Sequence, residues 1–117
     1  MDAAFERRRK RRGRAAETAT VAVLRLRGLR VLARNVRVRG AVEVDIVARS
    51  GSTLVLVEVK ARAADSGLEA VDARRRHGLR RAGEQLLADP AYAWARTLRF
   101  DVVAWHGLRP AHLTAAF

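Results

Sequence analysis

Apolar and polar residues alternate along two short segments in the middle of the chain, residues 42–47 and 54–60. Alternation with a period of two is typical of β-strands, because successive side chains of a strand point to opposite faces. Ser50-Gly51-Ser52 lies between the two segments and is typical of a tight turn. The pattern therefore predicts an antiparallel β-hairpin whose turn is centred between Gly51 and Ser52.

Two other segments show the apolar spacing of an amphipathic helix. The first runs from residue 13 to about residue 26, and Gly28 is its stop signal. The second runs from 68 to 88, where Asp72 is placed to cap the main part of the helix and Pro90 to close it.

Further apolar runs predict strands at 31–38 and 98–105, and a short last strand at 113–117. The resulting element order is αβββαβ(β). This order predicts an α/β fold class, in which helices flank a central mixed β-sheet.

The hairpin brings acidic residues and a lysine together. Its register places Asp45 opposite Glu58 and Glu43 opposite Lys60, while Glu58 and Lys60 point to the same face. Two carboxylates about 5 Å apart repel by roughly 3 kcal/mol at an effective dielectric constant near 20. A cation between them would remove the repulsion, so the pattern indicates a metal site. One or two carboxylates together with a substrate phosphate suffice for Mg²⁺. The spacing alone is equally compatible with an exposed salt bridge from Lys60 to Glu43 or Glu58.

The choice of lysine at position 60 favours chemistry over a generic salt bridge. The chain has 24 basic residues, and only Lys10 and Lys60 are lysines. In such an arginine-rich chain, any cation that served only as a charge would be expected to be arginine. An ammonium group is a compact point charge, and its pKa shifts readily. A guanidinium has neither property.

Composition excludes several classes of protein. The chain has 117 residues and no cysteine, so it forms no disulfide, uses no thiolate chemistry and binds no Cys-ligated zinc. No apolar run approaches the roughly 20 residues that span a bilayer, and no apolar signal core follows the basic N-terminus. We therefore expect a cytoplasmic protein without a membrane partner.

The net charge of +12 points to a polyanionic partner. Residues 1–12 are expected to form a basic, disordered N-terminal tail, and 13–117 a single domain. Aromatic residues are only 5% of the chain, which argues against stacking on single strands and favours double-stranded or branched DNA. The residues expected to bind nucleic acid are Arg7, Arg8, Arg9, Lys10, Arg11, Arg12, Arg14 and Arg74.

Glu17 is a further candidate for the acidic cluster. It shares a helical face with Val21 and Leu24, at offsets of four and seven residues. A lone acid on an apolar face is more often displaced to the rim of the core. The other interpretation is that Glu17 joins Asp45 and Glu58.

Other polar residues carry weaker signals. Asp101 is expected to form an internal ion pair near Arg99 or to cap a helix, and the three histidines lack metal-ligand spacing. Trp94 and Trp105 are expected to fill the core or an interface.

Five motifs in order make the chain from residue 13 to 117 resemble the YraN-like predicted endonucleases of the restriction-endonuclease-like, PD-(D/E)xK superfamily. Residues 13–17 are similar to G-x-x-G-E, with Ala16 in place of the second glycine, and 42–48 are similar to G-E-I-D-L-I-A, with Val42 in place of glycine. The other three are V-E-V-K at 57–60, A-V-D-x-K at 70–74 with Arg74 in place of lysine, and R-F-D-V-V at 99–103.

The resemblance implies roles for the clustered residues. Asp45 and Glu58 would ligate Mg²⁺ or Mn²⁺, with the Val59 carbonyl as a further ligand. Lys60 would position or activate water, and Glu17 would orient a metal-bound water or hold a second ion. Glu43 is a secondary candidate. Similarity to small Holliday-junction resolvases implies a homodimer, because such enzymes cut two strands symmetrically.

These observations favour a metal-dependent DNA endonuclease. The alternative is a non-catalytic, basic nucleic-acid-binding module on a nuclease fold, and a third hypothesis is a protein-binding adaptor that uses a sheet edge. Retention of Glu17, Asp45, Glu58 and Lys60 favours the enzyme, because clustered acids facing a polyanion do not help a pure binding module.

Overall fold

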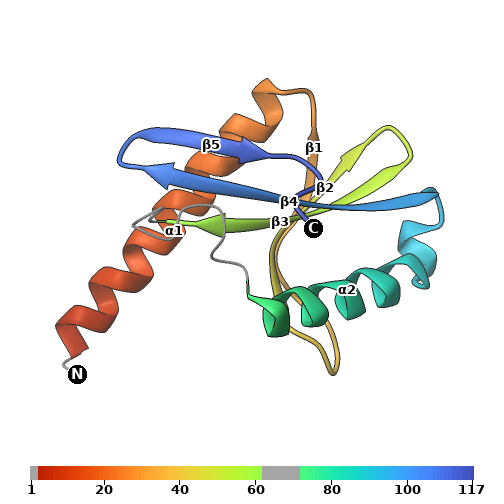
Figure 1. Ribbon diagram of the computed structural model, residues 1–117, viewed down its shortest axis with the longest axis horizontal. Coiled ribbons are helices and arrows are strands. Elements are labelled where there is room, and N and C mark those ends of the chain that lie inside the picture. Colours follow the sequence, from red (N-terminus) through yellow and green to blue (C-terminus); the bar gives the residue numbers. More distant parts are fainter. Residues whose placement is uncertain (1–2, 62–71) are drawn as a thin grey trace.

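A five-stranded sheet with helices on both faces forms the protein, as seen in a computed structural model that describes residues 3–61 and 72–117 (Figure 1). The observed order, αβββαββ, confirms the expected α/β class and is consistent with a restriction-endonuclease-like fold. In chain order the elements are α1 (Ala3–Leu26), β1 (Arg30–Arg37), β2 (Glu43–Ser50), β3 (Thr53–Lys60), α2 (Ala73–Leu87), the 3₁₀-helix η2 (Pro90–Tyr92), β4 (Thr97–His106) and β5 (Arg109–Leu113).

The strands lie in the order β1-β2-β3-β4-β5. Strands β3 and β4 are parallel, and every other neighbouring pair is antiparallel. A parallel pair needs a crossover connection, and α2 lies in that connection. The sheet is therefore mixed, as the sequence predicted.

The β2–β3 hairpin has the predicted register, with pairs running from Ile46↔Val57 to Ser50↔Thr53. Its turn contains Gly51 at φ 59°, a left-handed conformation that glycine adopts without steric strain. The turn residues therefore fix which side chains of β2 and β3 face each other.

Each face of the sheet is covered by one helix. Leu54 and Leu56 of β3 pack with Leu79, Ala82 and Leu86 of α2 in one core cluster. The alternate positions pack with α1 in a second cluster, which includes Val21, Leu24, Val55, Val57 and Val103. In Figure 1, α1 lies toward the left of the sheet and α2 toward the lower right. The three layers follow directly from the alternation of apolar residues in β3.

Glycines let α2 approach the sheet closely. A Cβ atom at Gly78 would lie 2.5 Å from Val42 Cγ1, and one at Gly83 would lie 2.5 Å from Leu98 Cδ2. Sequence alone suggests only that these glycines weaken the helix. The structure shows that each fills a position where a side chain would collide.

Two expectations about the ends of the chain were wrong. The backbone is helical from Ala3, so residues 3–12 continue α1 instead of forming a disordered tail, and Gly13 lies inside the helix. Residues 3–12 contain five arginines, two alanines, one lysine and one glutamate, and all of these are strong helix formers. Strand β5 is Arg109–Leu113, not 113–117, because Gly107 at φ 63° turns the chain back immediately after β4.

The second helix matches its prediction where the structure describes it. Asp72 is the N-cap, and its side chain accepts a hydrogen bond from the Arg75 N–H at 2.8 Å. The predicted helix start at residue 68 lies outside the described residues.

Candidate active site

The regular alternation of β2 breaks at Asp45. Val44 packs in the core cluster of α2 and Ile46 in that of α1, although they lie only two residues apart. In a regular strand they would face the same side. Asn35 of β1, which has a φ of 51°, lies opposite the break. The local change of face sets Asp45 apart from the apolar positions on either side.

The Asp45 carboxylate takes a main-chain partner from β3. Asp45 Oδ2 accepts a hydrogen bond from the Val59 N–H at 2.9 Å, just beyond the last backbone pair, Ile46↔Val57. This contact holds Asp45 beside Glu58, as the predicted register required. The Glu58 side chain is only 4% exposed.

The two acids share a hydrogen bond and divide their charge unequally. Burial, the hydrogen bond to Glu58 and the negative charge of Glu58 raise the pKa of Asp45 from 3.8 to about 7. The hydrogen bond from the Val59 N–H acts in the opposite direction and lowers this pKa. Burial would also raise the pKa of Glu58, but hydrogen bonds from Arg75 and Asp45 and the charges of Arg75 and Lys60 lower it. Glu58 is therefore the member of the pair that ionises more readily, and Asp45 is the member that keeps its proton to higher pH.

Arg75 of α2 is a site residue that the sequence interpretation missed. Its Nε donates to Glu58 Oε2 at 2.8 Å and its Nη2 donates to Glu58 Oε1 at 2.9 Å. The same Nη2 also donates to the Glu43 carbonyl oxygen at 2.8 Å. A signal was present: Arg75 precedes the buried residues Leu79, Ala82 and Leu86 by four, seven and eleven positions, so it extends the sheet-facing stripe of the helix.

Lys60 also contacts Glu58, with its Nζ 3.9 Å from Oε2. One of the two salt bridges left open by the spacing is therefore present. Glu43 does not take part in it, because its carboxylate lies 3.6 Å from Arg37 Nη2. Lys60 remains 26% exposed, so its ammonium group stays accessible from solvent.

Glu17 lies apart from this contact network. Its Oε1 is 3.8 Å from Arg34 Nη2, and this buried oxygen has no hydrogen-bond partner. Its charge contributes only the smallest of the influences that raise the pKa of Asp45. Among the described residues, no group of three Asp, Glu, His or Cys side chains is arranged to hold a metal ion. Direct ligation by Glu17 together with Asp45 and Glu58 therefore stays a prediction.

The donor set of Asp45 and Glu58 fits a hard divalent ion. Both are carboxylates, they are held together, and a cation replacing the proton between them would relieve their repulsion. Mg²⁺ and similar ions keep several waters and need few protein ligands. The two carboxylates, with the neighbouring Val59 carbonyl, would suffice as protein ligands.

The predicted nucleic-acid-binding residues are only partly covered by the structure. Arg14 and Arg74 are exposed, on α1 and on the first turn of α2. The side chains of Arg7, Arg8, Arg9, Lys10, Arg11 and Arg12 lie outside the part of the chain whose side chains are described. Their role in binding stays a prediction.

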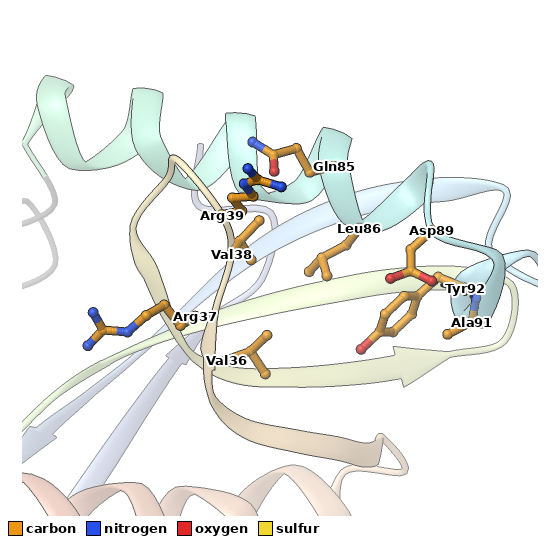
Figure 2. Close-up of a pocket in the computed structure, with 9 residues that line it drawn as sticks. All are labelled: Val36, Arg37, Val38, Arg39, Gln85, Leu86, Asp89, Ala91 and Tyr92. Atoms are coloured by element: carbon orange, nitrogen blue, oxygen red, sulfur yellow. Dashed lines mark hydrogen bonds between the residues drawn. The ribbon is translucent and has the colours of Figure 1, made fainter.

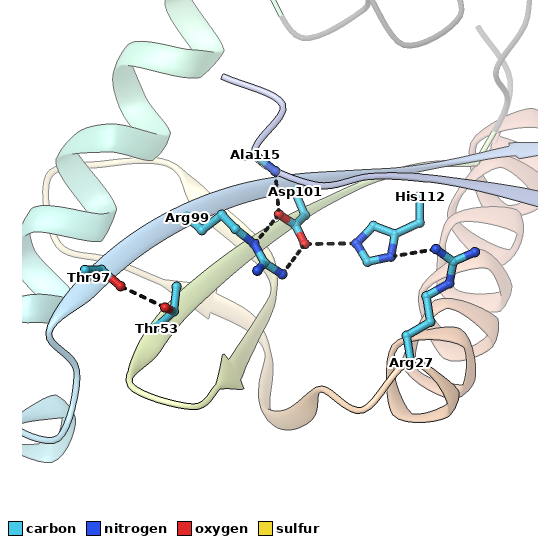
Figure 3. A network of polar contacts seen from close by, with 7 residues as sticks. All are labelled: Arg27, Thr53, Thr97, Arg99, Asp101, His112 and Ala115. Carbon is cyan, nitrogen blue, oxygen red and sulfur yellow. Dashed lines mark hydrogen bonds and ion pairs between the residues drawn. The ribbon is translucent and has the colours of Figure 1, made fainter.

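A second buried acid, Asp101, is fully paired (Figure 3). Arg99 donates to both of its carboxylate oxygens, at 2.9 and 3.0 Å, which confirms the expected ion pair. His112 Nε2 and the Ala115 N–H complete the set at 2.9 and 3.0 Å. His112 is thus a satisfied polar residue, as expected, although its pairing with Asp101 depends on the hairpin of β4 and β5.

A separate cavity of about 460 Å³ lies near the C-terminal end of α2 (Figure 2). Its lining combines β1 and the following loop with the end of α2 and η2. The lining residues are Val36, Arg37, Val38, Arg39, Gln85, Leu86, Asp89, Ala91 and Tyr92. None of the acids of the candidate active site lines it.

None of the helices in the described part of the chain is both long enough and apolar enough to cross a lipid bilayer.

Trp105 packs against the core cluster of α1 and donates to Thr20 Oγ1 at 2.9 Å, and Trp94 packs against the cluster of α2. Both tryptophans are partly buried and pack at the edge of a core cluster.

Comparison with known proteins gives consistent matches over most of the chain. The model of a family described as "Uncharacterised protein family UPF0102" matches residues 16–105. A UPF0102 protein of Methylocella silvestris is 42% identical over 106 residues, which are 89% of this chain and 85% of that protein. A UPF0102 protein of Methylorubrum extorquens is 44% identical over 108 residues, or 91% and 84% of the two chains. One from Methylobacterium nodulans is 41% identical over 120 residues, or 99% and 92%.

Proposed function

This chain belongs to the uncharacterised protein family UPF0102, the YraN family, and for it we propose divalent-metal-dependent hydrolysis of phosphodiester bonds in DNA. The observation that carries the proposal is the pair Asp45–Glu58. The half-buried Asp45 is held next to the buried Glu58 by the Val59 N–H, and the accessible Lys60 ammonium group contacts Glu58. A pair of this kind is costly in a fold unless a cation is meant to occupy it.

Asp45 and Glu58, with the Val59 carbonyl, would hold Mg²⁺ or Mn²⁺. When bound, such an ion neutralises charge on the phosphate and makes a bound water more acidic. Lys60 lies on the same face as Glu58, and its ammonium group can donate a hydrogen bond to an attacking water or to a phosphate oxygen. Its link to Glu58 holds the ammonium group at the site before substrate arrives.

The proposed substrate is double-stranded or branched DNA, in the cytoplasm, and the proposed active form is a homodimer. The charge of +12 and the exposed residues Arg14 and Arg74 support a polyanionic partner. Guanidinium groups on helix surfaces suit backbone phosphates and carry no base preference.

The test is cleavage of labelled linear, nicked and four-way-junction DNA in Mg²⁺ or Mn²⁺. Lys60→Ala, purified identically, exposes contaminating nuclease, and Arg109→Ala removes one exposed charge of β5 that is not assigned to the site. We expect cleavage by wild type and Arg109→Ala, and none by Lys60→Ala or in excess chelator. Equal cleavage by wild type and Lys60→Ala would show that the activity is not this protein's.

A second candidate is a basic DNA-binding module without turnover. It is favoured by the contacts of Arg75 and Lys60 with Glu58, which already neutralise that carboxylate without a metal. Tight DNA binding that is unchanged by chelator, with no cleavage of any of the three substrates, would establish this candidate in place of the nuclease.

A further inference from the structure

Arg75 is paired with the carboxylate of Glu58, which the proposed metal site needs as a ligand. Both oxygens of Glu58 accept hydrogen bonds from this one guanidinium, in the bidentate geometry that makes Arg–carboxylate pairs strong. The Lys60 ammonium approaches the same Oε2 atom from another side. Glu58 therefore has a full set of cationic partners before any divalent ion binds.

The position of Arg75 is fixed by more than its ion pair. It lies in the first turn of α2, where Asp72 caps its backbone N–H, and its Nη2 is anchored to the Glu43 carbonyl of β2. The Arg75 side chain is nevertheless 28% exposed, whereas the Glu58 side chain is 4% exposed. Arg75 is therefore the solvent-facing member of the pair.

We propose that Arg75 is a resident cation that competes with the divalent ion for Glu58, so that loading the metal releases the Arg75 guanidinium at the mouth of the site. The inference rests on the proposed metal site and adds a control element to it. Each oxygen of Glu58 keeps a second lone pair, but a divalent ion bound there would lie at contact distance from the guanidinium, and the two positive charges would repel. Once released, the planar group would be available to a phosphate of the substrate.

The alternative role for Arg75 is purely structural, as a clip that holds α2 against β2 and β3. The two roles predict opposite effects on metal affinity. Loss of a competitor makes the carboxylates more available and tightens binding. Loss of a clip loosens the geometry of the site and weakens binding.

The experiment measures binding of Mn²⁺ alone by calorimetry, with wild type, Arg75→Ala, Arg75→Gln and Arg81→Ala. Arg81 is exposed on the same helix, so its variant controls for removal of one positive charge. Arg75→Gln keeps a hydrogen-bonding side chain without the charge, and it carries the test if Arg75→Ala does not fold. We expect both Arg75 variants to bind Mn²⁺ about tenfold more tightly than wild type, and Arg81→Ala to match wild type.

Thermal melting provides a second readout that does not depend on cleavage. Without metal, both Arg75 variants should melt below wild type, because Glu58 loses its partner in a buried position. Added Mn²⁺ should raise their melting temperature by more than it raises that of wild type. Unchanged or weaker Mn²⁺ binding in the folded Arg75 variants, or no Mn²⁺ binding by any of the proteins, would overturn the inference.

The outcome is distinguishable from that of the proposed function. Tighter Mn²⁺ binding by the Arg75 variants without cleavage by any protein would support the competition and refute the hydrolysis. Cleavage by wild type with unchanged Mn²⁺ affinity in the Arg75 variants would support the hydrolysis and refute the competition.

Discussion

Replacing Asp45 with asparagine should change how the stability of the protein depends on pH. Asparagine resembles the protonated acid: its Oδ1 can still accept the Val59 N–H, and its Nδ2 can donate to Glu58. It cannot lose a proton. The variant therefore keeps the favourable contacts of the neutral acid and removes the repulsion between two carboxylates.

The sign follows from the direction of the pKa change. The pKa of Asp45 is raised from 3.8 to about 7, so between these values the folded protein holds a proton that the unfolded chain has lost. The free energy of unfolding therefore falls as pH rises through this window. The pKa of Glu58 is lowered, and its contribution has the opposite sign, being present above the unfolded value of 4.5 and lost as pH falls through the folded value. Between pH 5 and 7, Asp45 alone gives the downward slope.

The full difference in the pKa of Asp45 corresponds to about 4 kcal/mol at 1.36 kcal/mol per pH unit. Asp45 keeps some contact with solvent, which screens the interaction, so we expect about 2 kcal/mol between pH 5 and 8. For a chain of this length that is a shift of about 8 °C in melting temperature. At pH 8, in chelator, Asp45→Asn should be more stable than wild type by this amount, while at pH 5 the two should nearly coincide.

The assay is urea unfolding at pH 5, 6, 7 and 8 in the presence of chelator, with Glu84→Gln as the control. Glu84 is exposed on α2, so its variant reports the general effect of removing one acid from a strongly basic protein. The difference in unfolding free energy between wild type and Asp45→Asn should widen with pH. Parallel curves for the two proteins would refute the assignment of a raised pKa to Asp45.

Three further predictions follow from the contacts. Gly78→Ala should lower the free energy of unfolding by about 1 to 2 kcal/mol, because the added Cβ meets Val42. In urea titrations the double variant Gly78→Ala/Val42→Ala should recover this loss. If it does not, the destabilisation does not come from the contact with Val42. Asp101→Asn should cost about 3 to 5 kcal/mol, because Arg99 and His112 lose a buried partner, and should leave Mn²⁺ affinity unchanged by calorimetry; a changed affinity would mean that Asp101 acts on the site. Lys60→Arg should keep DNA affinity in filter binding but lower the cleavage rate by about tenfold or more, because a guanidinium is bulkier and more diffuse than an ammonium group; wild-type cleavage would show that only the charge matters.

The parts of the fold that local sequence rules determine were predictable. Alternation in β2 and β3 and the glycine at position 51 fixed the hairpin register, and the register alone brought Asp45 beside Glu58. The cap at Asp72 was visible for the same reason, because capping depends on residues within one helical turn.

The parts that depend on long-range packing were harder to predict. Arg75 reaches Glu58 only because α2 crosses the sheet at one position and angle, which Gly78 and Gly83 permit by removing side chains from the contact. Whether Arg74 or Arg75 faces the sheet depends on the rotation of α2 about its own axis. A residue on the buried stripe faces the sheet, and its neighbour in sequence faces solvent.

A comparison of Asp45 with Asp101, an acid of the same sheet, shows why we propose a cation-binding role for Asp45. At Asp101 the chain surrounds a carboxylate with a bidentate arginine, an imidazole and a backbone N–H, which is how a fold satisfies an acid that only holds it together. At Asp45 the same sheet provides one backbone N–H and then a second acid, and it places the available cations on Glu58 instead. A purely structural position would gain stability by replacing Asp45 with a neutral residue, so the arrangement costs stability at neutral pH without helping the fold. We propose that this cost is recovered when a positive charge enters between Asp45 and Glu58, which the divalent ion of the proposed function would supply.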